Sequence, residues 1–139
     1  MMEINIMNIL VIDAQGGGIG KQLITAIKKN IPDFCITAVG TNTVATSAML
    51  KAGADKAATG ENAVVVNSRV ADVIIGPIGI VIADAMLGEI TAKMANAVAQ
   101  SSAKRILIPV NHCDNIVVGV ADLNITKLIQ AVIIELEKY

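Results

Sequence analysis

The chain has 139 residues and a formal net charge of −1, so it has the length of one domain and no basic excess for nucleic acid or an anionic membrane. The first residues lack the basic segment of a signal peptide, and the uncharged apolar run of residues 73–83 is too short to span a bilayer. Cys35 and Cys113 are the only cysteines, too few for a disulfide framework. We therefore expect one cytoplasmic domain over residues 1–139, with neither nucleic acid nor membrane as a partner.

Hydrophobic residues make up 54% of the chain, above the roughly 45–50% of ordinary globular proteins. Strands buried on both faces of a parallel sheet are apolar at nearly every position and account for much of this excess of hydrophobic residues. The remainder predicts a subunit interface, so we expect a homo-oligomer. Phe34 and Tyr139 are the only aromatic residues, so a bound nucleobase would lie between aliphatic side chains.

The first half of the chain alternates apolar, strand-like runs with apolar residues at helical spacing. Pro32 and Gly53 stand where two of the helices would end. Residues 61–69 are ambiguous, because three consecutive valines favour a strand whereas the alternation favours a helix, which we adopt. The predicted elements are strand 6–12, helix 19–31, strand 34–39, helix 44–52, strand 55–59 and helix 61–69.

The second half continues the same alternation, with Thr91 placed to cap a helix. Residues 80–87 are too short for a clear helix and too regular for a loop. The predicted elements are strand 72–76, helix 92–103, strand 105–110, a short edge strand 116–119 and an amphipathic helix 125–136. The whole pattern predicts one doubly wound α/β fold, with a mostly parallel sheet and helices on both faces.

Small, polar or glycine-rich segments follow the predicted strands. In an open α/β sheet, ligands bind outside the carboxyl ends of the strands, near the point where the strand order reverses. These segments therefore predict a ligand site on one edge of the sheet. The residues expected to bind a cofactor are Asp13, Gln15, Gly16, Gly17, Gly18, Ile19, Gly20, Lys21, Thr41, Asn42, Gly76, Pro77 and Asn111.

The glycine-rich loop after the first strand resembles three nucleotide-binding patterns and satisfies none of them. The pattern G-x-G-x-x-G fits Gly16 and Gly18 but meets Lys21 where it needs a third glycine. The short-chain dehydrogenase pattern meets Ala14 at its first glycine, and a phosphate P-loop meets Gln22 where it needs a hydroxyl. Glycines nevertheless let backbone N–H groups approach an anion at a helix N-terminus. We expect an anionic ligand there; the alternative is a tight turn that requires positive φ.

The end of the second strand usually distinguishes between dinucleotides. NAD sites place an acid there for the ribose hydroxyls, whereas NADP sites often place an arginine. Residues 40–43 of this chain contain no acid. Thr41 and Asn42 would suit a 2′-phosphate, another phosphate or a carboxylate, and would equally suit the N-cap of the next helix. NADP or another phosphate-bearing nucleotide is therefore the expected cofactor.

His112 and Cys113 are the candidates for catalysis, at the end of a predicted strand. His112 is the only histidine and would act as an acid or base near neutral pH. Adjacent side chains tend to point apart, so a direct Cys–His pair is not assured, and the alternative is a solvated loop with an idle thiol. Asp13 could serve a hydroxyl or Mg²⁺ or brace the glycine turn, and Asp84 and Glu89 are further acids in apolar or edge positions. No metal site is expected.

Six stretches of the sequence resemble a bacterial family catalogued as domain of unknown function 3842. They are residues 13–21, 39–43, 45–54, 59–62, 76–79 and 108–111. The resemblance covers nearly the whole chain and implies a Rossmann-like domain. It implies no activity, so it assigns no catalytic residue.

Three functions remain open from the sequence. The first is a nucleotide- or dinucleotide-binding protein, with NADP-linked oxidoreduction as its enzymatic form. The second is a non-catalytic sensor or assembly subunit that binds a small anion. The third is an enzyme that acts on a small metabolite through His112 and Cys113.

Overall fold

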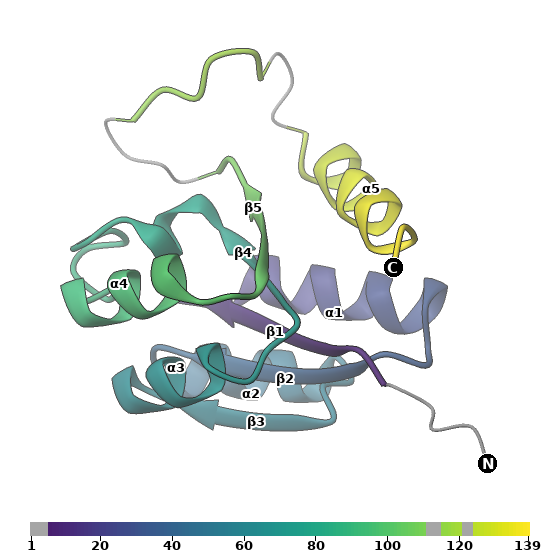
Figure 1. The fold of residues 1–139 in the computed structure, drawn as a ribbon, viewed down its shortest axis with the longest axis horizontal. Helices are drawn as coiled ribbons and strands as arrows, with labels where there is room; N and C mark the ends of the chain where they lie inside the picture. Colours follow the sequence, from purple (N-terminus) through teal and green to yellow (C-terminus); the bar gives the residue numbers. More distant parts are fainter. Residues whose placement is uncertain (1–5, 111–114, 121–123) are drawn as a thin grey trace.

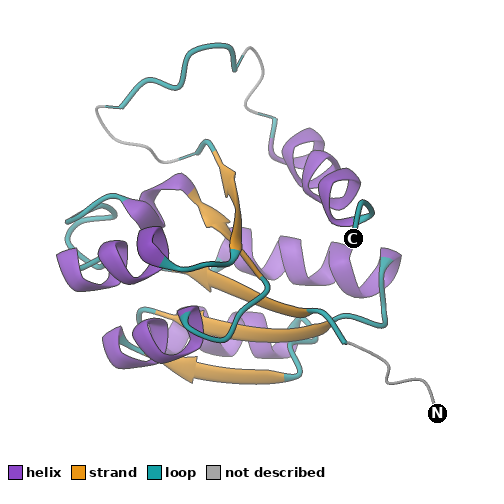
Figure 2. Cartoon of the chain, in the orientation of Figure 1, coloured by secondary structure: helices purple, strands orange, loops and turns teal. Residues whose placement is uncertain are grey.

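The computed structural model describes residues 6–110, 115–120 and 124–139. Its centre is a five-stranded, all-parallel sheet with the strand order β3-β2-β1-β4-β5. Helices cover both faces of this sheet, and α5 lies beside α1 (Figures 1 and 2). The architecture is therefore the predicted α/β fold, with the Rossmann-like strand order 3-2-1-4-5.

The elements follow the predicted alternation, with ends that shift by a few residues. The strands are β1 (Asn8–Asp13), β2 (Cys35–Gly40), β3 (Lys56–Thr59), β4 (Val73–Pro77) and β5 (Lys104–Ile108). The helices are α1 (Gly18–Asn30), α2 (Thr43–Lys51), α3 (Glu61–Ser68), the 3-10 helix η1 (Ile78–Val81), α4 (Ala92–Gln100) and α5 (Ile125–Leu136).

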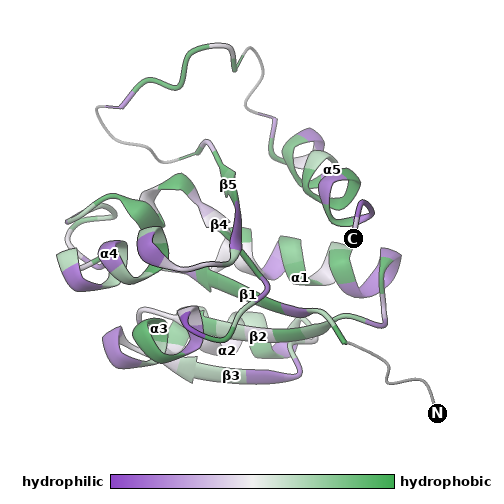
Figure 3. Ribbon diagram, in the orientation of Figure 1, coloured by the Kyte–Doolittle hydropathy of each residue, from purple (hydrophilic) through white to green (hydrophobic). Residues whose placement is uncertain are grey.

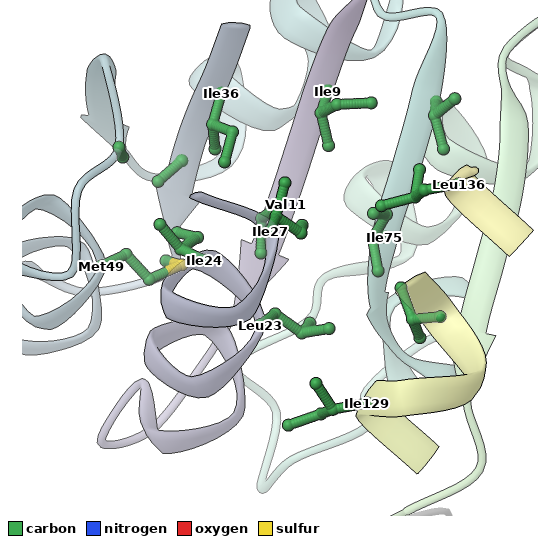
Figure 4. Packing of buried hydrophobic residues seen from close by; sticks show 14 of the residues in the cluster. Ile9, Val11, Leu23, Ile24, Ile27, Ile36, Met49, Ile75, Ile129 and Leu136 are labelled. Carbon is green, nitrogen blue, oxygen red and sulfur yellow. The ribbon is translucent and has the colours of Figure 1, made fainter. Parts of the chain in front are cut away.

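Two hydrophobic clusters hold the layers together, one on each face of the sheet. On one face, α1, α2 and α5 pack against side chains such as Ile9, Val11 and Ile36 (Figure 4). On the other face, α3, α4 and the segment after η1 pack against Leu10 and Ile12. Successive residues of β1 thus point into opposite clusters, which explains why this strand is apolar at nearly every position. The hydropathy colouring shows apolar and polar segments in alternation along α1 and α4, as expected of helices with one buried face (Figure 3).

The structure contradicts one sequence prediction and shows the conformation of two ambiguous runs. The predicted strand 116–119 is wrong, because residues 115–120 form no strand and Ile116 and Val118 are exposed. A strand exists only with a hydrogen-bonded neighbour, and the β-branched residues of this run have none among the described residues. The ambiguous run 80–87 begins with the end of η1 and continues as a series of turns. Residues 61–69, in contrast, do contain the adopted helix, α3.

The strand order defines where a ligand can approach. The chain builds β1, β2 and β3 outward in one direction and then returns to place β4 on the other side of β1. The reversal therefore lies between β1 and β4, and the loops after both strands open onto the same edge of the sheet.

Among the described residues, none of the helices has both the length and the apolarity needed to cross a bilayer.

Candidate functional site

The glycine-rich loop makes a tight turn between β1 and α1. The Gly17 N–H donates to the Ala14 carbonyl at 3.0 Å, which closes the turn. Positive φ occurs at Gln15 (53°) and Gly17 (73°). A non-glycine residue in this conformation costs about 1–3 kcal/mol and persists only where its surroundings impose it. The backbone of Gln15 is therefore held in place by contacts outside the loop.

Asp13 occupies the positive end of helix α1. Its side chain is only 4% exposed, and its two carboxylate oxygens accept hydrogen bonds from Gly20 N at 2.7 Å and Ala14 N at 2.8 Å. Burial raises the pKa of Asp13, although the N–H groups around it act in the opposite direction. The carboxylate thus satisfies part of the first turn of α1. Of the alternatives open from the sequence, bracing the glycine turn agrees best with this position.

The glycines of the loop divide into two kinds. A Cβ on Gly17 would lie 2.8 Å from the Ala45 Cα, and a Cβ on Gly20 would lie 2.5 Å from the Met49 Sδ. These two glycines let α2 approach α1 and the loop closely. A Cβ on Gly16 or Gly18 would meet nothing within 4 Å, and neither residue has positive φ. Fold geometry therefore accounts for Gly17 and Gly20 but not for Gly16 and Gly18.

The carboxylate of Glu89 joins the glycine loop to the end of β2. Its Oε1 accepts hydrogen bonds from Gln15 N at 2.9 Å, Thr41 Oγ1 at 2.7 Å and Asn42 Nδ2 at 2.9 Å. Asn42 Nδ2 also donates to the Gln15 carbonyl at 3.0 Å, while its Oδ1 caps α2 by accepting from Ala45 N. The Gln15 N–H and the Thr41 hydroxyl lower the pKa of Glu89. We call Gln15, Thr41, Asn42 and Glu89 the Glu89 cluster.

A compact loop after η1 carries Glu89 into this position. Asp84 N donates to the Ile90 carbonyl at 2.7 Å and closes the loop. Ala85, Met86 and Ile90 are buried in the cluster on the α3 and α4 face. Asp84, Met86 and Leu87 all have positive φ, between 55° and 64°. The loop is therefore fixed by its buried side chains in a conformation that costs backbone strain, a pattern found at functional sites.

The remaining predicted residues lie around this cluster in different settings. Ile19 is half-buried and packs against the core, and Gly76 lets β4 approach the Ile12 carbonyl. Pro77 ends β4. Lys21 is exposed and lines an open groove of about 590 Å³ together with residues of α2. Asn111, His112 and Cys113 lie outside the described residues.

Another groove lies away from these loops, between α3 and α4. It has a volume of about 490 Å³ and is lined by Ser68, Arg69, Lys93 and other polar residues. None of the residues that the sequence predicts to bind a cofactor lines it. Hydrogen bonds and unexplained glycines, rather than cavity volume, therefore locate the candidate site at the carboxyl edge.

These features define a Rossmann-like α/β protein with a candidate ligand site at the carboxyl ends of β1 and β2. The chain belongs to the family described as domain of unknown function (DUF3842), whose model matches residues 8–139. A comparison with curated proteins finds no match.

Sequence reasoning placed Glu89 among the acids at the edge but did not assign it to the site. The residue lies 74 positions from Gln15 in the sequence, and no spacing pattern connects the two. The signal available in the sequence was local: Glu89 is an acid that follows Gly88, a turn-forming residue, and precedes the apolar Ile90. Only the folded loop shows which neighbours this carboxylate meets.

Proposed function

We propose that the protein binds a nucleotide or dinucleotide at the carboxyl edge of its sheet, with the backbone of Gly16 and Gly18 against the phosphate groups. The observation that carries the proposal is the open space above these two glycines. Glycine is used where a ligand must approach the backbone closely. A methyl group at either position would meet nothing in the described protein, but it would occupy the volume of such a ligand.

The hydrogen-bonding capacity of the loop supports this placement. Among the described residues, no acceptor is found for the N–H of Gly16 or Gly18. The N–H of Gly20 is already taken by Asp13. A phosphate would therefore lie over Gly16 and Gly18, off the axis of α1 and away from the buried carboxylate. Lys21, on the first turns of α1, adds a cation nearby.

The test is a thermal-unfolding screen of the whole chain against NAD, NADP, ADP, ATP, FMN, S-adenosylmethionine and inorganic phosphate. A ligand at 100 times its dissociation constant adds about 2.7 kcal/mol of stability, which is a shift of several degrees for a domain of this size. We expect a nucleotide to raise the Tm of the wild type, and Gly16→Ala and Gly18→Ala to abolish the shift without lowering the Tm of the free protein.

Three results would count against the proposal. It fails if no nucleotide shifts the Tm, or if both glycine variants retain the full shift. A shift with inorganic phosphate that the nucleotides do not exceed would replace it with the small-anion sensor. NADP-linked oxidoreduction would additionally require turnover with the bound dinucleotide, lost in His112→Ala.

We also propose that the protein is a homo-oligomer. Large apolar side chains remain exposed on several parts of the described chain, among them Val70 (67%), Leu87 (95%), Ile116 (87%), Val118 (92%) and Ile134 (60%). Subunit interfaces bury exposed apolar side chains of this kind when they gather in one patch. Light scattering over a range of concentrations would give a mass above that of one chain, and a constant monomer mass would refute this proposal.

A further inference from the structure

Glu89 stands where nucleotide-binding sheets of this strand order place an acid. In such sheets an Asp or Glu at the end of the second strand accepts hydrogen bonds from the ribose hydroxyls. Residues 41–43, directly after β2, include no acid. The loop after η1 nevertheless brings a carboxylate to the same place, within hydrogen-bonding distance of Thr41 and Asn42 at the end of β2.

The two oxygens of this carboxylate have different surroundings. Oε1 accepts three hydrogen bonds, which join it to the glycine loop and to the end of β2. Among the described residues, no donor contacts Oε2. A carboxylate can accept about four hydrogen bonds. Oε1 therefore fixes the orientation of the group, and Oε2 keeps the capacity to accept from a ligand.

The charge of the group determines which ligands it accepts. Hydrogen bonds to the Glu89 carboxylate favour its ionised form and lower its pKa. An ionised carboxylate only accepts hydrogen bonds, so it suits hydroxyl donors and repels a phosphate. No described lysine or arginine forms an ion pair with it that would offset this repulsion.

We propose that Glu89 is the specificity-determining residue of the site, that its Oε2 accepts hydrogen bonds from the 2′ and 3′ hydroxyls of a ribose, and that it excludes a 2′-phosphate. This inference rests on the proposed nucleotide binding. It reverses the preference expected from the sequence, where the missing acid after the second strand favoured a 2′-phosphate. The acid that selects the sugar comes instead from the loop after η1.

The experiment compares dissociation constants, by calorimetry, for NAD, NADP, ADP and 2′-deoxyADP. In the wild type we expect NAD to bind at least tenfold more tightly than NADP, and ADP about ten- to hundredfold more tightly than 2′-deoxyADP, the value of a hydrogen bond to a charged group. Glu89→Gln retains an acceptor for the three donors but not the charge. We expect it to reduce both preferences to within about threefold.

Glu61→Gln is the matched control. Glu61 lies on the same edge, at the start of α3, and its Oε2 accepts from Thr91 Oγ1 at 2.6 Å. Among the described residues, no hydrogen bond joins its side chain to the glycine loop or to the end of β2, so both preferences should remain as in the wild type. Circular dichroism and the Tm verify that each variant is folded. Glu89→Asp provides a second variant, which keeps the negative charge but shortens the side chain by one methylene.

The outcomes separate this inference from the proposed function. Equal affinities for ADP and 2′-deoxyADP in the wild type would overturn the role of Glu89 while leaving nucleotide binding intact. Tighter binding of NADP than NAD would do the same, as would preferences that Glu89→Gln leaves unchanged or that Glu61→Gln also removes. Binding of FMN alone, which carries a ribityl chain and no ribose ring, would also overturn it. If no nucleotide binds, the proposed function fails and this inference fails with it.

Discussion

Gly17→Ala should be the most destabilising single methyl addition in the glycine-rich loop. Gly17 has φ 73°, and an L side chain in the left-handed region costs roughly 1–2 kcal/mol. The new Cβ would also lie 2.8 Å from the Cα and 2.9 Å from the carbonyl oxygen of Ala45. Because both atoms belong to the backbone of α2, the contact cannot be relieved by rotating a side chain, and overpacking of this kind costs about 1–3 kcal/mol. We expect a total loss of about 2–5 kcal/mol.

Gly18→Ala is the matched comparison, one residue away and with the same chemical change. Gly18 begins α1, and its added Cβ would meet nothing within 4 Å. Alanine reduces the conformational entropy of the unfolded chain, so this variant should gain about 0.4–1 kcal/mol. Urea unfolding followed by circular dichroism measures both changes as shifts in the midpoint at a constant m value. For a chain of this length each kcal/mol corresponds to roughly 3–5 °C in Tm.

The contrast between the two variants is what the structural argument predicts. If Gly18→Ala lost as much stability as Gly17→Ala, the assignment of one glycine to backbone contact and the other to open space would be wrong. If neither variant lost stability, α2 would have to move away from the loop at little cost, contrary to the burial of Ala45 and Met49.

Four further predictions concern Asp13, Glu89 and Asn42. Asp13→Asn should destabilise the protein by about 1–3 kcal/mol, measured by urea unfolding, because one buried N–H at Ala14 or Gly20 loses its acceptor; an unchanged midpoint would contradict this. Burial raises the pKa of Asp13. The wild type should therefore lose stability relative to Asp13→Asn as the pH rises from about 3.9, the unfolded pKa, through the folded pKa. A stability advantage of the wild type that increases over this pH range would contradict the prediction. The pKa of Glu89 is lowered, so the stability that Glu89 contributes, measured against Glu89→Gln, should be present above about pH 4.3 and disappear as the pH falls through the folded pKa. Asn42→Asp keeps the cap of α2 but places a second carboxylate opposite Glu89. This variant should therefore lose stability at pH 7 and lose less in acid.

The sequence predicted the order and type of most elements because each has its own periodicity. The helix from Gly18 to Asn30 carries buried residues at Leu23, Ile24 and Ile27, a spacing that one face of a helix requires. Local chemistry was equally informative at the helix ends. Thr91 caps α4 by accepting from Met94 N, and Asn42 caps α2, as their side chains allow at any N-cap.

The run 116–119 shows the limit of this reasoning. Its residues have high β propensity, but a strand also needs an adjacent strand with unpaired backbone groups. Propensity describes one segment, whereas pairing depends on two. The candidate site has the same limit, because the separate roles of Gly16 and Gly17 depend on how close α2 lies, and no feature of the glycine run encodes that distance.

By itself, the sequence determined that strands and helices alternate, that the sheet is parallel and that glycine and polar residues gather at the carboxyl ends of its strands. These properties follow from hydrophobic period and turn chemistry, which act over a few neighbouring residues. The tertiary structure alone decided the strand order and the position of Glu89 beside Gln15, Thr41 and Asn42. Contacts between distant segments follow from the packing of the loop after η1 against the sheet, and packing is a property of the whole fold.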